Sequence, residues 1–256
     1  MRLSWAVAAV AMLAVAGARA APPSPVVAAL AMLKSGGTGL AAGWRYEEKI
    51  STARGSERLS YDPARTVGER WQVLAVNGKT PSEAARKRLA AQAARASATA
   101  NSAIAVGSGW LATSDYRLVK TTAKTLVYQL RPQPASGDES GAAKLLRHLA
   151  GQFVVARDDH HPLALSLDNF ESFSPRFGVR IEAFAFRAEF RRLGNSGPVV
   201  VVHTSNSARG KVFWIKQFED KTEVTLSGFA PVTASAAGPV PERSPHAQTA
   251  SAVNRS

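Results

Sequence analysis

Residues 179–190 read VRIEAFAFRAEF, and this pattern indicates the architecture of the chain. Phe184, Phe186 and Phe190 recur at even spacing, with the small Ala188 between them. Because successive side chains of a strand point to opposite faces of a sheet, this period predicts a long strand with one apolar face. Long antiparallel strands of this kind must close into a barrel, stack as a sandwich or be covered by helices.

Segments with the same alternation occur along most of the chain. In residues 44–50, Trp44, Tyr46 and Ile50 share one face and charged side chains occupy the other. The turn pair Asn77-Gly78 ends another such segment. Short polar turns between the segments predict an antiparallel sheet of about ten or eleven strands. We expect the remaining strands at residues 57–62, 70–76, near 110 and through 116–119, and at 123–131, 152–157, 162–167, 199–204, 211–218 and 223–229.

A few segments have helical patterns instead, and we expect helices at residues 26–34, 81–95 and 141–149. The first is expected to stop at Gly36-Gly37. The second begins with Thr80-Pro81-Ser82-Glu83, where side-chain oxygens satisfy free N–H groups of the first turn. The small and polar residues 96–103 then predict a mobile connection.

The first twenty residues have the pattern of a secretory signal peptide. Arg2 precedes an apolar run over residues 6–16, and Ala18 and Ala20 are small, as a signal peptidase requires. The run is shorter than the stretch of about 20 apolar residues that a membrane-spanning helix needs. We therefore expect export to the periplasm, cleavage after Ala20, and no membrane-spanning segment.

Composition narrows the function classes further. The chain has no cysteine, which excludes a thiolate nucleophile and a disulfide framework. The net charge of +13 suits a solvated basic surface, an anionic lipid or a cell-wall polymer, and export argues against nucleic acid as the partner. We expect a signal peptide at residues 1–20, one domain at 21–230, and a disordered Ala/Ser/Pro-rich tail at 231–256.

Four short motifs have residue types found in catalytic sites, and we interpret each as a turn. Asp158-Asp159-His160-His161 has metal-ligand residue types, but neighbours on a strand face opposite ways, so a polar hairpin tip is favoured over a metal site. Residues 107–109, 194–198 and 207–211 contain glycines that turns between strands explain. We expect no enzyme activity, no metal and no cofactor.

Aromatic side chains at alternate strand positions are the more informative feature. They can form a core beneath covering helices, or they can line an apolar cavity. The Ala-rich and highly charged helix at 81–95 offers only a thin apolar stripe, which favours the cavity. The residues expected to line it are Trp44, Tyr46, Trp71, Phe184, Phe186, Phe190 and Trp214.

The order of these features resembles a known family. A short N-terminal helix is followed by Gly43-Trp44-Arg45-Tyr46, by Tyr61-Asp62-Pro63 and by residues 70–81, RWQVLAVNGKTP. This layout, over residues 26–230, is similar to exported proteins of the outer-membrane lipoprotein-sorting (LolA-like) superfamily of Gram-negative bacteria. The resemblance implies an α+β fold in which an open antiparallel half-barrel is covered by two or three helices and holds acyl chains on its concave face.

The first hypothesis is therefore a monomeric periplasmic binding protein, without enzyme activity, that holds a lipid or acyl chain. The alternative is a cell-envelope interaction or sensor module with a self-packed sheet, which binds a protein or an anionic polymer. A hydrolase, the third hypothesis, would need His160 or His161 to act with a nearby carboxylate.

Overall fold

The computed structural model describes residues 21–134, 140–213 and 215–232, with the side chains of residues 37–42, 95–108 and 141–142 left aside. The predicted signal peptide, Trp214 and nearly all of the predicted tail lie outside the described residues. The helices are α1 (Ser24–Gly43), α2 (Glu83–Thr113) and α3 (Gly141–Leu146). The strands are β1 (Trp44–Thr52), β2 (Gly55–Tyr61), β3 (Trp71–Val76), β4 (Asp115–Thr121), β5 (Thr125–Arg131), β6 (Leu149–Ala156), β7 (Pro162–Asn169), β8 (Phe173–Arg176), β9 (Val179–Arg192), β10 (Val199–Val212) and β11 (Lys216–Pro231).

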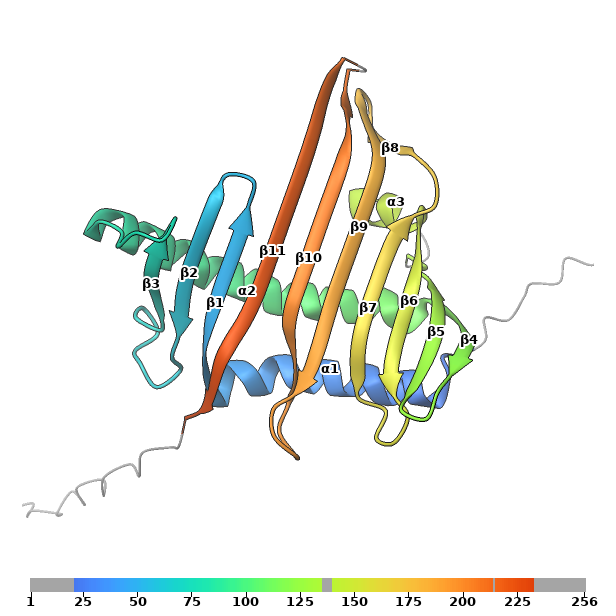
Figure 1. The fold of residues 1–256 in the computed structure, drawn as a ribbon, viewed down its shortest axis with the longest axis horizontal. Helices are drawn as coiled ribbons and strands as arrows, with labels where there is room; N and C mark the ends of the chain where they lie inside the picture. The colour runs from blue at the N-terminus through green and yellow to red at the C-terminus, as the bar shows by residue number, and fades with distance from the viewer. Residues whose placement is uncertain (1–20, 135–139, 214, 233–256) are drawn as a thin grey trace, which may run out of the picture.

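Within the described residues the strands form one antiparallel sheet in the order β3-β2-β1-β11-β10-β9-β7-β6-β5-β4, with β8 paired to β9. The last strand, β11, lies between β1 and β10, and so joins the N-terminal strands to the rest of the sheet. β3 and β4 are the two edges, and the sheet remains open (Figure 1). This arrangement confirms the predicted half-barrel of antiparallel strands with three helices.

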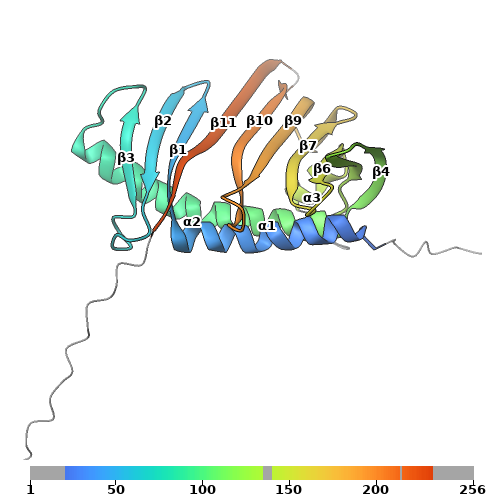
Figure 2. The ribbon, with the colours of Figure 1, turned by 60° about the horizontal axis from the view of Figure 1, so that its bottom comes forward.

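Helices α1 and α2 lie side by side across one face of the sheet, which we call the inner face (Figure 2). Apolar side chains of α1, including Val26 and Leu33, pack with Phe153 of β6 and Leu165 of β7. Figure 1 shows that the far ends of β9, β10 and β11 extend well beyond both helices. The helices therefore cover only part of the face.

The expected end of the first helix was wrong. Instead of stopping at Gly36-Gly37, α1 continues to Gly43. A Cβ atom on Gly36 would lie 1.9 Å from the backbone oxygen of Val199 in β10. Gly36 therefore permits close contact between helix and sheet, a reason that local sequence does not reveal.

The second helix is also longer than expected. Its start is close to the predicted one, with the Ser82 hydroxyl accepting a hydrogen bond from the Ala85 N–H. It then continues without a break to Thr113, so the predicted connection at 96–103, the strand near Trp110 and the turn at 107–109 are all wrong. The alanines of this segment favour a helix, and the packing of Trp110 against the core holds its end.

Further boundaries differ from the predictions in β10, β11 and α3. Residues 207–211, expected to form a turn, continue β10, which ends at Val212. The strand expected at 211–218 is interrupted between Val212 and Lys216, and its last residues belong to β11, which continues through the strand expected at 223–229. Ladder hydrogen bonds from β9 and β11 on either side override the local turn preference of serine and glycine. The helix expected at 141–149 ends at Leu146, before β6 begins. The polar turns at 158–161 and 194–198 are confirmed.

Candidate functional site

Two groups of buried side chains occupy opposite ends of the inner face. The first, the central cluster, joins α1 and the end of α2 to β5, β6, β7, β9 and β10, and its largest fully buried member is Phe153. The second, the aromatic cluster, joins β1, β2 and β3 to the first half of α2. Its buried members are Tyr46, Leu59, Tyr61, Trp71, Val73 and Leu89, with Phe229 packed against them.

The aromatic cluster contains two of the predicted lining residues. The ring centroid of Tyr46 lies 5.1 Å from that of Tyr61, 5.9 Å from that of Trp71 and 6.0 Å from that of Phe229. Such distances are typical of favourable aromatic packing. Tyr46 and Trp71 are buried beneath Leu89 of α2, so they belong to a filled core.

The three phenylalanines of β9 lie at the other end of the face. Phe190 is buried within the central cluster, whereas Phe184 and Phe186 are half-buried at its margin. Ala188, which lies between them on the strand, is also buried, and this agrees with the prediction that the three phenylalanines share one face. The structure therefore brings the phenylalanines together and separates them from Tyr46 and Trp71. Trp44 is half-buried at the start of β1, and Trp214 lies outside the described residues.

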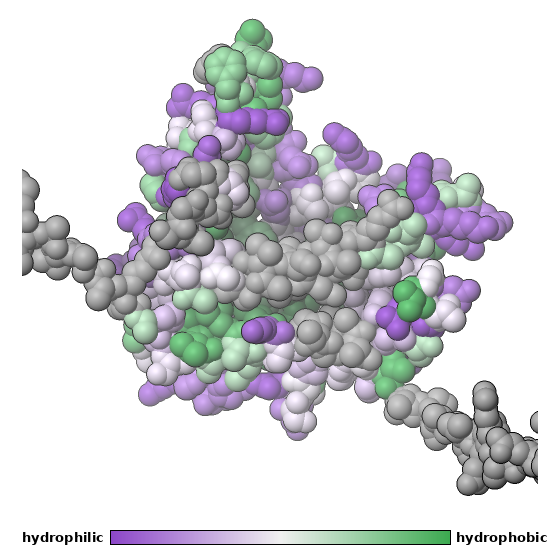
Figure 3. Space-filling view, turned by 180° about the vertical axis from the view of Figure 1, so that it is seen from behind, coloured by the Kyte–Doolittle hydropathy of each residue, from purple (hydrophilic) through white to green (hydrophobic). Residues whose placement is uncertain are grey.

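Between the two clusters the inner face has half-buried side chains of mixed polarity. Ala188 of β9 is in register with Thr204 of β10, which pairs with Val224 of β11, which in turn pairs with Ile50 of β1. In the space-filling view from the helix side, the surface is recessed next to the tall end of the sheet and includes hydrophobic as well as polar residues (Figure 3). We call Phe184, Phe186, Thr204, Val224 and Ile50 the open part of the inner face.

The carboxyl group of Glu48 lies on this same face. Glu48 is in register with Leu59 of β2 and Leu226 of β11, two positions with apolar side chains. Burial raises the pKa of Glu48 above its usual value. Burial, followed by the charges of Glu48 and Tyr61, also raises the pKa of Tyr46. Burial among these neighbours therefore opposes the charged form of both groups.

The outer face has a polar hollow of about 600 Å³ that sequence reasoning did not find. Arg187 donates hydrogen bonds to both carboxylate oxygens of Asp168 at 2.8 and 2.9 Å there. In the sequence both residues occupy polar positions of strands in which polar and apolar side chains alternate. Only the register of β7 and β9 brings them together. The hollow is lined by Val119, Gln129, Ala150, Gly151, Gln152, Ser166, Asp168 and Arg187.

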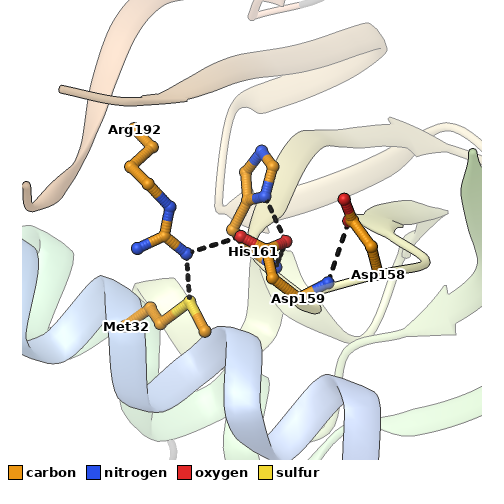
Figure 4. A network of polar contacts seen from close by, with 5 residues as sticks. All are labelled: Met32, Asp158, Asp159, His161 and Arg192. Atoms are coloured by element: carbon orange, nitrogen blue, oxygen red, sulfur yellow. Dashed lines mark hydrogen bonds and ion pairs between the residues drawn. The ribbon is translucent and has the colours of Figure 1, made fainter. Parts of the chain in front are cut away.

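The Asp158–His161 motif lies in the turn between β6 and β7, where it takes part in a polar network (Figure 4). Arg192 of β9 donates to Asp159 Oδ2 at 2.8 Å and also reaches the sulfur of Met32 in α1 at 3.5 Å. His161 contacts the other oxygen, Oδ1, through its ring Nδ1 and its backbone N–H. The network therefore ties the turn to a strand and a helix that are distant in sequence.

Ligand atoms of Asp158, Asp159 and His161 lie within 4.8 Å of one another, a spacing that can hold a metal ion. Both oxygens of Asp159 already have partners, and the positive charge of Arg192 opposes a cation there. Burial tends to raise the pKa of Asp159, but hydrogen bonds and charge from His161, with the hydrogen bond from Arg192, lower it well below its usual range. We therefore assign the motif a structural role.

Asp159→Asn is expected to lower the free energy of unfolding by about 1 kcal/mol at pH 7, since both ion-pair partners are partly exposed to water. Because the pKa of Asp159 is lowered by folding, its contribution is present above the ordinary aspartate pKa of about 3.9 and is lost as the pH falls further. The difference between wild type and variant should therefore shrink below about pH 4. Urea unfolding at several pH values measures it.

Asp158→Asn is the matched control, because the Asn side chain keeps an oxygen that can accept from the Asp159 N–H. Its free energy of unfolding should stay close to that of the wild type at every pH. An equal loss in the two variants would show that Arg192 does not stabilise the turn through Asp159.

Comparisons with known proteins add one weak similarity. No family model and no curated protein matches the sequence. Among solved structures, the chain is similar to one described as "Crystal structure of MucB in complex with MucA(peri)", with 13% identity, 82% of this chain and 99% of that chain covered, and a TM-score of 0.21. Within the described residues, no helix has the length and apolarity to cross a membrane. The half-barrel architecture is thus established by the strands themselves, and membership of the LolA-like superfamily stays a prediction.

Proposed function

We propose that this chain is a periplasmic binding protein without enzyme activity that holds a lipid acyl chain against the open part of the inner face. The observation that carries the proposal is the partial burial of Phe184 and Phe186. These two large rings continue the apolar face of β9 beyond the central cluster, but lack the full cover that Phe190 receives.

An acyl chain would complete this cover. Every methylene group that leaves water against the rings contributes about 0.8 kcal/mol, so a chain of several methylenes would be held stably. The sheet is open at its edges β3 and β4, and the helices leave the far ends of the long strands uncovered (Figure 2). A flexible chain can therefore reach the face without a large rearrangement of the fold.

The periplasmic location rests on the N-terminal sequence, in which an apolar run at residues 6–16 is followed by Ala18 and Ala20. Two features of the described residues support binding over catalysis. The Asp158–His161 motif is committed to a structural network, and Glu48 is placed among apolar neighbours. Neither arrangement offers a nucleophile beside a base.

The experiment is native mass spectrometry of the protein purified from the periplasm without detergent, followed by solvent extraction. Phe186→Asp is expected to abolish lipid loading, because a carboxylate would have to be desolvated against the ligand. Phe170→Asp is the matched control, since the Phe170 side chain is exposed on the segment between β7 and β8, and it should load normally. Thermal unfolding followed by circular dichroism checks that both variants fold.

Two outcomes contradict the proposal. If Phe186→Asp loses folding yield and loading equally, Phe186 is an ordinary core residue. If the wild-type protein carries no lipid, and takes none up from phospholipid vesicles or an acylated peptide, the alternative of an envelope interaction module is favoured. That module should then bind its protein or anionic polymer in a strongly salt-dependent manner.

A further inference from the structure

The far end of the long strands bears three large apolar side chains on the surface. Phe177 lies between β8 and β9, and Phe213 and Ile215 lie between β10 and β11. Their exposed fractions are 87%, 59% and 88%. Figure 1 shows this end projecting beyond the rest of the molecule, and Figure 3 shows hydrophobic surface at its extremity. We call Phe177, Phe213 and Ile215 the apolar tip.

The tip is built by contact between two hairpins. The backbone N–H of Phe213 donates to the carbonyl oxygen of Gly178 at 2.6 Å. The ring of Phe213 lies against Gly178, where a Cβ atom would come within 2.7 Å of the ring. Gly178 also has a φ of 74°, a conformation that favours glycine. The two turns therefore form one connected unit and present their apolar side chains together.

Basic side chains surround the tip. Residues 176–180 and 211–217 contain Arg176, Arg180, Lys211 and Lys216 and have no acidic residue. Arg176, Arg180 and Lys216 are exposed. Lys211 forms an ion pair with Glu182 at 3.0 Å. An exposed apolar group surrounded by cationic side chains is complementary to a surface with an anionic outer layer and an apolar layer beneath it.

We propose that the apolar tip inserts into the interface of an anionic phospholipid bilayer. Phe177, Phe213 and Ile215 enter the headgroup region, and the surrounding arginine and lysine side chains pair with lipid phosphates. The shape favours a bilayer, because a narrow projecting end reaches a flat surface without collision from the body of the protein (Figure 1). Exposed apolar groups of this kind mark interaction sites on soluble proteins.

Docking of the tip does not depend on ligand binding, but it would hold the ligand-binding face close to the membrane. Phe184 lies on β9, which begins next to the tip, and follows Gly178 by six residues. At about 3.3 Å per residue, the open part of the inner face begins roughly 20 Å from the membrane surface. The strands that dock at the bilayer therefore continue into the face proposed to hold an acyl chain.

The test is flotation of the mature protein, purified without the predicted signal peptide, with phosphatidylcholine vesicles that contain or lack the anionic lipid phosphatidylglycerol. Wild-type protein should float with the anionic vesicles and much less with the neutral ones. Phe213→Ser/Ile215→Ser should reduce the partition coefficient by about tenfold or more. Arg176→Gln/Lys216→Gln should reduce it and weaken its dependence on salt.

Val67→Ser is the matched control, because Val67 is an exposed apolar side chain in the loop between β2 and β3 at the other end of the sheet. It should float as the wild type does. Phe186→Asp should also float normally, so that a failure of ligand binding and a failure of docking are told apart. All the substituted tip residues are exposed, and their unfolding curves should match that of the wild type.

The proposal is overturned if the wild type does not float with anionic vesicles, or if the tip variant floats equally well. It is also overturned if sedimentation equilibrium shows that the wild type is a dimer and the tip variant a monomer, and if the wild type does not bind vesicles. That result would assign the tip to a second copy of the chain.

Discussion

Phe153→Ala is expected to lower the free energy of unfolding by about 3–5 kcal/mol, the largest loss from any single truncation considered. Phe153 is 0% exposed and lies in the middle of β6, in register with Tyr128 of β5 and Leu165 of β7. Its ring centroid is 6.3 Å from that of Tyr116. Removal of the ring leaves a cavity in a rigid sheet, which cannot collapse to refill it. Urea unfolding of wild type and variant, fitted with the same dependence of the free energy of unfolding on urea concentration, measures the loss.

The matched control is Phe177→Ala, in which the same ring is removed from a position that is 87% exposed. We expect a change within about 0.5 kcal/mol. A small effect of Phe153→Ala would mean that the central cluster contributes little to the stability of the half-barrel, contrary to the burial of its members. A large effect of Phe177→Ala would mean that the tip is part of the core.

Gly36→Ala is expected to destabilise the protein by about 2 kcal/mol or more, even though alanine is the better helix former. The added methyl group would lie 1.9 Å from the carbonyl oxygen of Val199, so α1 would have to move away from β10. That movement would also loosen Val26 and Leu33, which pack on the central cluster. Thermal and urea unfolding measure the effect.

Gly43→Ala separates the packing effect from the helix preference. Gly43 is the last residue of α1, and a Cβ atom there would have nothing within 4 Å. This variant should be as stable as the wild type or slightly more stable, since alanine favours the helix by up to about 1 kcal/mol. Opposite signs at the two glycines would confirm the close approach of α1 to the sheet. Equal and small effects would contradict it.

Local patterns predicted several elements well, because their causes are local. The alternation in β9 determines which side chains share a face, and Ala188 and Phe190 are buried as expected. Asn77-Gly78 forms the predicted turn, with φ angles of 51° and 74°, and the Asn77 side chain accepts a hydrogen bond from the Ser56 N–H at 2.7 Å. The alternation of β9 and the turn preference of Asn-Gly each act within a few residues, whereas the Ser56 N–H that Asn77 accepts from is 21 positions away in the sequence.

The predicted site was less accessible to sequence reasoning. Alternation placed Tyr46 and Phe186 on apolar faces, but it does not say which strands lie between them. The insertion of β11 between β1 and β10 puts Tyr46 in the aromatic cluster and Phe186 at the edge of the central one. The apolar tip was missed because Phe177 and Phe213 belong to different hairpins, which meet only in the folded sheet.

The sequence by itself determined the strand-rich class of this protein, the apolar face of β9 and the polar turns at 158–161 and 194–198. These properties depend on the alternation of side chains and on the preferences of short segments. The tertiary structure decided the role of Gly36, the length of α2 and the partners of Asp159 and Phe213. Each of these depends on backbone and side chains that approach from distant parts of the chain, and such contacts outweigh local preferences once the sheet is assembled.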